Sequence, residues 1–206
     1  MSRLSDNPAG TDATSSTTTP SFTPEQRHLL LGIARASIAS RLAGDPLPDS
    51  PPPAASFFPA LTEPRGVFTT LYLAGELRGC VGYALPLRPL FRAVAETASA
   101  AAFEDSRFWP VTPEEAPSLR ISLSVLSPLF PITANEVEVG RHGLLISSGM
   151  RRGLLLPQVP VEHGWDRETF LAQTCHKAGL PLDAWRKSAT LEAFTAEVFG
   201  DEGAPA

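Results

Sequence analysis

Cysteine is scarce in this chain of 206 residues, with only Cys80 and Cys175 present. Two cysteines are too few for the disulfide framework of a small secreted protein, and too few for a cysteine-based zinc or iron–sulfur site. A chain of this length buries enough apolar surface to fold without disulfides. The cysteine content therefore predicts a protein of the reducing cytoplasm.

Long hydrophobic runs are absent as well. The longest ones, such as 29–31 and 154–156, fall far short of the ~20 residues that cross a bilayer. The first residues carry Arg3, Asp6 and Asp12 but no continuous apolar stretch, so they resemble neither a secretory signal nor a transit peptide. The sequence thus predicts no membrane span and no export.

Patterns for nucleic-acid or metal binding are weak. The formal net charge is −5, whereas nucleic-acid-binding proteins usually carry a basic face. A continuous basic surface around Arg151 and Arg152 would be needed to reverse that expectation. The histidines show no ligand spacing, and no phosphate loop, dinucleotide fingerprint or Gly-x-Ser-x-Gly motif occurs. The sequence therefore predicts no metal site and identifies no cofactor.

Composition divides the chain into three parts. Residues 1–21 are rich in Ser, Thr and Pro and carry few large apolar groups, so they are expected to form a disordered leader. Residues 22–200 are expected to form one domain, which contains a proline-rich loop at 46–53. Residues 201–206 are expected to be a frayed tail.

Helix and strand signals alternate along the domain. Thr23 to Gln26 has the pattern of a capping box, and the apolar spacing from 87 to 102 predicts a helix that packs on a sheet. Two β-prone runs, 67–73 and 76–82, flank Ala74-Gly75 and predict a hairpin. Further strands are expected at 119–125, within 136–156 and at 194–199, and a helix is expected from Asp166 to Gly179.

Three segments resemble the AMMECR domain family. They are Gly-Glu-Leu-Arg-Gly-Cys-Val-Gly at 75–82, Ala-Ala-Phe-Glu-Asp-Ser-Arg-Phe at 101–108 and Leu-Leu-Pro-Gln-Val-Pro-Val-Glu-His-Gly-Trp at 155–165. The resemblance covers about residues 23–199 and implies a two-lobed α+β fold, with a mainly antiparallel sheet flanked by helices. Within this family, the chain is similar to the A component of AmmeMemoRadiSam systems. This similarity implies an accessory role beside a Memo-like protein and a radical SAM protein. It assigns no reaction.

Arg78 and Cys80 are the sharpest candidates for chemistry. Residues two apart on a strand share a face about 7 Å from each other, close enough for a guanidinium to stabilise a thiolate. The alternative is that Cys80 is a small buried apolar side chain and Arg78 pairs with an acid. Gly79 and Gly82 beside them indicate either tight packing or a ligand cleft.

A second set of candidates lies on loops. Gln158, Glu162 and His163 precede a helix, where His163 could act as a general base oriented by Glu162, or where all three could simply cap and solvate the loop. Arg107 is expected to pair with Asp105 or with backbone groups, and it is also a candidate ligand-binding residue.

Two functional hypotheses follow. The first is a non-catalytic binding or accessory subunit that uses a groove near the 78–82 hairpin. The second is an enzyme that modifies a small metabolite, with Cys80 as nucleophile or redox group, Arg78 as its electrostatic support and His163 or Glu162 as acid or base. The second hypothesis predicts that these groups converge in one pocket.

Overall fold

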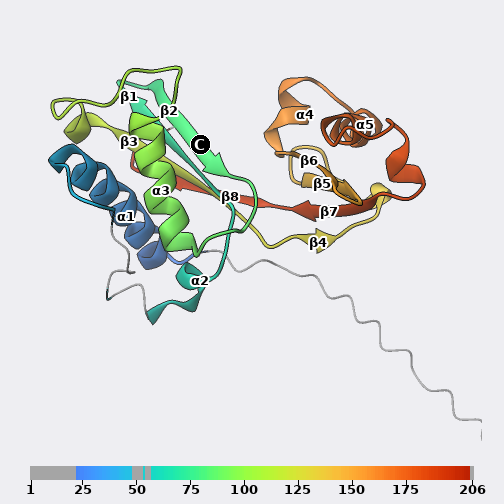
Figure 1. Cartoon of the computed structure of the whole chain (residues 1–206), viewed down its shortest axis with the longest axis horizontal. Coiled ribbons are helices and arrows are strands. Elements are labelled where there is room, and N and C mark those ends of the chain that lie inside the picture. The colour runs from blue at the N-terminus through green and yellow to red at the C-terminus, as the bar shows by residue number, and fades with distance from the viewer. Residues whose placement is uncertain (1–21, 48–52, 54–56, 205–206) are drawn as a thin grey trace, which may run out of the picture.

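The computed structural model describes residues 22–47, 53 and 57–204. These residues form an α+β fold with two four-stranded antiparallel sheets and five α-helices. Figure 1 shows two lobes, one built around each sheet. The predicted leader at 1–21, most of the proline-rich loop at 46–53 and the last two residues lie outside the described residues.

The first lobe combines the N-terminal half of the chain with its last strand. Its elements are α1 (Pro24–Ala43), α2 (Pro59–Thr62), β1 (Val67–Leu73), β2 (Glu76–Tyr83), α3 (Leu90–Phe103), the 3-10 helix η2 (Ala116–Ser118), β3 (Arg120–Leu126) and β8 (Ala196–Gly200). The strand order is β2-β1-β3-β8. Both long helices cover the same face of this sheet (Figure 1).

Alternation along the strands places the main core between that face and the helices. Leu71 on β1 and Leu123 on β3 are fully buried together with Leu30 of α1 and Val94 of α3. The capping box predicted for α1 is confirmed, since the Thr23 side chain accepts from the Gln26 N–H. The hairpin at 67–83 is also confirmed.

The second lobe is formed by the segment between β3 and β8. Its elements are β4 (Phe130–Pro131), the 3-10 helix η3 (Ala134–Glu136), β5 (Gly143–Ser148), β6 (Arg151–Leu155), α4 (Gln158–Glu162), α5 (Arg167–Lys177), the 3-10 helix η4 (Ala184–Arg186) and β7 (Thr190–Phe194). The strand order is β4-β7-β5-β6. The predicted cap of α5 is confirmed, because Asp166 accepts from the Thr169 N–H at 2.8 Å.

The chain crosses between the lobes twice, once after β3 and once before β8. The two crossing segments are hydrogen-bonded to each other. The Ser127 N–H donates to the Thr195 carbonyl oxygen at 2.8 Å. The Thr195 N–H donates to Ser127 Oγ at 3.0 Å instead of to a backbone carbonyl. A side chain thus replaces one ladder partner at the point where the β7–β8 segment leaves one sheet and joins the other.

Several predicted boundaries differ from the structure. The helix predicted from Leu87 begins at Leu90, because Pro89 is its N-cap and Leu87 is an exposed loop residue. The strand predicted at 194–199 is divided between β7 and β8. In the segment expected to fray, Asp201 accepts from the Ile121 N–H and pairs with Arg35, so the chain after β8 is anchored there.

Candidate functional site

Cys80 lies on β2, the edge strand of the first sheet. The turn before it uses Ala74 at φ 53° and Gly75 at φ 87°, the positive dihedrals that a two-residue hairpin turn requires. The register of β1 against β2 shifts next to Leu71, which leaves Arg78 as an extra residue on β2. Such a bulge bends an edge strand and redirects its side chains.

Asp105 and Arg107 form hydrogen bonds with the backbone N–H and carbonyl of Cys80 at the free edge of the sheet. The Cys80 N–H donates to Asp105 Oδ2 at 2.8 Å, and Arg107 Nη2 donates to the Cys80 carbonyl oxygen at 3.3 Å. Arg107 also donates to both carboxylate oxygens of Asp105, at 2.7 and 3.0 Å. The pair thus takes the hydrogen-bonding positions of a neighbouring strand at one point of a free sheet edge.

This arrangement shifts two titrations. The hydrogen bonds from Arg107 hold the pKa of Asp105 well below its usual range, against the opposing effect of burial and with help from the Cys80 N–H. The same pairing raises the pKa of Arg107. The guanidinium that contacts Cys80 is that of Arg107, which bonds to its backbone carbonyl, whereas the sequence had suggested Arg78 as the cation beside the thiol.

Arg78 is engaged by an acid. Its Nη2 donates to Glu115 Oε2 at 2.9 Å and its Nε donates to Oε1 at 3.2 Å, a bidentate pair that lowers the pKa of Glu115. Arg78 Nη1 is buried without a hydrogen-bond partner among the described residues. Glu115 also accepts from the Thr112 N–H at 2.9 Å, so one carboxylate closes a turn and holds the hairpin.

Residues 104–115 are called here the strap, because this segment is hydrogen-bonded to β2 at two places. Asp105 and Arg107 fix one end at Cys80, and Glu115 fixes the other end at Arg78. Between these anchors, Trp109 is 88% exposed. A large apolar side chain is thus presented to solvent by a segment that is held at both ends.

The face of the first sheet opposite α1 and α3 is called here the open face, since none of the described helices packs on it. Directly paired residues of antiparallel strands share a face. Thr70 pairs with Cys80 on one side and with Ser122 on the other, and Ser122 pairs with Gly200. Thr70 Oγ1 donates to Cys80 Sγ at 3.3 Å, which places the thiol on this face.

The two glycines beside Cys80 serve packing. A Cβ on Gly79 would lie 2.1 Å from the Ala101 carbonyl oxygen, so only glycine allows α3 to lie this close to β2. A Cβ on Gly82 would lie 2.2 Å from the ring of Phe68, which rests against that glycine on the open face. The close approach predicted for glycine in a strand is thus made by a helix in one case and by a ring in the other.

Gln158, Glu162 and His163 belong to the second lobe. The predicted loop is the short helix α4 with His163 as its C-cap, and all three side chains are exposed. The ring of His163 stacks on Trp165, with centroids 4.7 Å apart. Figure 1 shows α4 apart from β2, so the structure does not bring His163 or Glu162 next to Cys80. The reason is that residues 155–165 lie between the two lobe crossings and fold with the second sheet.

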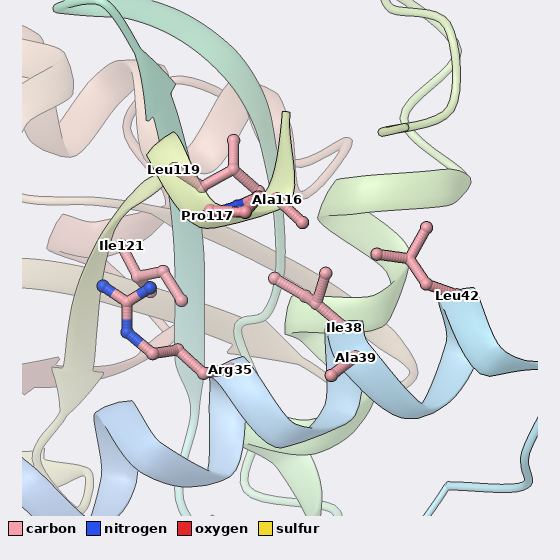
Figure 2. A pocket seen from close by; sticks show the side chains of 8 residues that line it. All are labelled: Arg35, Ile38, Ala39, Leu42, Ala116, Pro117, Leu119 and Ile121. Carbon is pink, nitrogen blue, oxygen red and sulfur yellow. The ribbon is translucent and has the colours of Figure 1, made fainter. Parts of the chain in front are cut away.

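A pocket of about 230 Å³ lies on the helix side of the first sheet (Figure 2). It is lined by Arg35, Ile38, Ala39, Leu42, Ala116, Pro117, Leu119 and Ile121. Its only charged lining residue, Arg35, is already paired with Asp201. The pocket contains none of the predicted site residues and lacks the convergent polar groups of a catalytic site.

Within residues 22–47, 53 and 57–204, no three His, Cys, Asp or Glu side chains are grouped closely enough to hold a metal ion. No helix of the same ranges combines the length and apolar character needed to cross a membrane.

Sequence reasoning missed the roles of Thr70, Ser122 and Glu115. Glu115 had a visible signal as the last residue of a capping box, but nothing local indicated its second bond to Arg78. Ser122 lies between two apolar residues of its strand, which predicts an outward side chain, whereas Thr70 directly follows Thr69, so alternation alone does not say which threonine points outward. Their alignment with Cys80 depends on the strand register, which the sequence did not define for β3.

Fold and site together describe a two-lobed α+β protein with a helix-backed sheet whose edge is held by an acid–arginine pair. A family model described as AMMECR1 matches residues 31–199. The chain belongs to the AMMECR1 family.

Archaeal proteins are among its relatives. The chain is 45% identical over 194 residues to a protein of Thermococcus gammatolerans, covering 86% of this chain and 91% of the relative. It is 42% identical over 188 residues to Protein MJ0810 of Methanocaldococcus jannaschii, covering 86% and 91%. The crystal structure of uncharacterized protein PH0010 from Pyrococcus horikoshii is 41% identical with a TM-score of 0.64, and the match covers 85% of this chain and 92% of that one. None of these names states an activity.

Proposed function

We propose that this AMMECR1-family protein is a non-catalytic binding component that acts with a Memo-like protein and a radical SAM protein, and that the strap on the β2 edge is its docking surface. The observation that carries the proposal is the 88% exposure of Trp109 between two anchored ends of the strap.

The charged groups around the hairpin favour a scaffold over a reaction centre. Arg78 is bonded to Glu115, and Arg107 is bonded to Asp105 and to the Cys80 carbonyl. Each of these charges is used within the fold, and among the described contacts the Cys80 thiol bonds to the Thr70 hydroxyl and to no acid or base. The side chains that the family signature supplies here therefore hold the strap in place.

Rigidity of the strap favours tight docking. Tryptophan and arginine are enriched among the few interface residues that carry most binding free energy. A segment whose backbone is already held in place loses less conformational entropy on binding. Besides its two anchors, the strap is closed by the Val111 N–H, which donates to the Ala102 carbonyl at 2.9 Å, and by the Phe108 N–H, which donates to the Asp105 carbonyl at 3.0 Å.

The test is binding of the purified Memo-like and radical SAM proteins from the same organism, measured by surface plasmon resonance. Trp109→Ala is expected to weaken binding by about 30-fold, the effect of a hot-spot residue worth about 2 kcal/mol. Met150→Ala is the matched control, because Met150 is 98% exposed on the second lobe. Failure of both partners to bind the unaltered protein, or equal effects of the two variants, would refute the proposal.

The alternative function is an enzyme that modifies a small metabolite through Cys80. It is favoured by one observation, the partial exposure of Cys80 on the open face beside the Thr70 hydroxyl. Arg107 would then replace Arg78 as the cation near the thiol. Loss of turnover in Cys80→Ser with retained partner binding would support this alternative over docking alone.

A further inference from the structure

The two lobes have separate cores. Among the described residues, the largest cluster of buried apolar side chains lies entirely in the first lobe, and the two smaller clusters lie entirely in the second. No helix or strand of one lobe packs extensively on an element of the other within the same ranges. The ion pairs between described residues likewise join partners of one lobe. Parts of a chain that share no large apolar interface are expected to move relative to each other.

Each lobe closes its own core up to the point where the chain crosses. Leu126 ends β3 and is 2% exposed, and its Cδ1 lies 2.8 Å from the position that a Cβ on Gly66 would take. Phe194 ends β7 and is 1% exposed, and its ring lies against Gly143 in the same way. The two buried side chains that flank the crossing thus fill notches left by glycines of their own lobes. Neither notch is formed by the other lobe.

The crossing segments are short and are bonded through one serine. The first consists of residues 127–129 and the second of Thr195 alone. Ser127 Oγ accepts from the Thr195 N–H at 3.0 Å and donates to the Pro128 carbonyl oxygen at 2.9 Å. A side-chain bond thus stands where a backbone ladder bond would otherwise lie, and both Ser127 and Thr195 are only partly buried. Few buried apolar contacts and hydrogen bonds within reach of solvent are the features of a segment that opens at low cost in free energy.

We propose that Ser127 and Thr195 form a hinge about which the two lobes rotate relative to each other. Protein hinges are a few residues at the ends of rigid elements, and these two residues follow β3 and separate β7 from β8. Because both crossing segments are short, the lobes change their angle but do not come apart. The proposal is independent of docking at the strap and of thiol chemistry at Cys80, since the strap and Cys80 belong to the first lobe and move with it.

Residual dipolar couplings of the unaltered protein, measured by nuclear magnetic resonance in a dilute alignment medium, test the proposal. The backbone couplings of each lobe are fitted to the structure of that lobe alone, which gives one alignment tensor per lobe. Rotation about the hinge, on the microsecond-to-millisecond timescale of such motions, averages the couplings of the smaller second lobe. Its tensor is therefore expected to be smaller in magnitude than that of the first lobe. Tensors of equal magnitude would overturn the proposal, because they mean that the lobes form one rigid body.

Ser127→Ala tests whether this residue is the pivot. It removes the acceptor of the Thr195 N–H, so the tensor of the second lobe is expected to shrink further relative to that of the first. Ser124→Ala is the matched control, since it removes the same hydroxyl group from a part of β3 that is paired on both sides. An unchanged ratio of the two tensors in Ser127→Ala, or an equal change in Ser124→Ala, would contradict the assignment of the hinge to Ser127 and Thr195.

Discussion

Replacing Asp105 by alanine removes the carboxylate that holds the Cys80 backbone. Its side chain is 6% exposed, so its loss leaves the Cys80 N–H without its 2.8 Å acceptor at a shielded position. An orphaned donor of this kind costs roughly 1–3 kcal/mol. Arg107 loses its acid too, but its side chain is 55% exposed and the loss adds only about 0–1 kcal/mol. The expected decrease in the free energy of unfolding is therefore about 1–4 kcal/mol, measured by urea denaturation.

The pH dependence of the free energy of unfolding tests the role of Asp105 independently. The folded-state pKa of Asp105 is depressed, so the stability it contributes is fully present above the unfolded pKa of about 3.9 and is lost as the pH falls toward the folded value. Asp105→Asn keeps the shape of the side chain and one acceptor but cannot titrate. The stability difference between the unaltered protein and Asp105→Asn should therefore shrink below about pH 4.

Two results would refute this reasoning. One is a loss smaller than about 0.5 kcal/mol in Asp105→Ala, the range of ordinary surface substitutions. The other is a stability difference for Asp105→Asn that stays constant down to acid pH. Glu162→Ala on exposed α4 is the matched control, because it removes an acid that makes no contact with the strap.

Three further predictions test the surrounding structure. Gly79→Ala places a Cβ 2.1 Å from a carbonyl of α3 and should destabilise by about 1–3 kcal/mol or more in urea, whereas Gly32→Ala, with open space around its Cβ on α1, should stabilise by about 0.5–1 kcal/mol. Iodoacetamide should modify partly exposed Cys80 in the native protein and fully buried Cys175 only after unfolding, as read by mass spectrometry, and equal rates would contradict the burial. Burial lowers the pKa of His142, so stability should fall as the pH drops below the unfolded pKa of about 6.5, and His142→Gln should flatten that part of the stability curve.

Local signals predicted local structure well. Thr23 and Gln26 marked the start of α1, Asp166 marked the start of α5, and Ala74-Gly75 marked the hairpin turn. In each case the decisive interaction joins residues within one turn of the chain. Such interactions are visible in sequence because spacing alone brings the partners together.

Interactions between distant segments were not predictable in this way. The run from 194 to 199 was predicted as one strand, yet it divides between β7 and β8 at Thr195, which is hydrogen-bonded with Ser127 across the lobe crossing. The proposed convergence of His163 with Cys80 failed for a related reason. α4 directly follows β6 and so belongs to the second lobe, whereas Cys80 lies in the first, and the division of the chain between the two lobes was not visible in the sequence.

Two of the three family-like segments prove to be parts of one structure. The segment 75–82 supplies the edge strand with its bulge at Arg78, and the segment 101–108 supplies Asp105 and Arg107, which bond to that strand at Cys80. The Leu-Arg-Gly-Cys pattern thus has a structural use at three residues. The Arg78 side chain pairs with Glu115, Gly79 leaves room for α3, and the backbone of Cys80 bonds to Asp105 and Arg107. None of these uses requires a reactive thiol. A Cys80→Ala variant should therefore keep the strap in place, whereas Asp105→Ala should release it, and this contrast separates a scaffolding role of the pattern from a catalytic one.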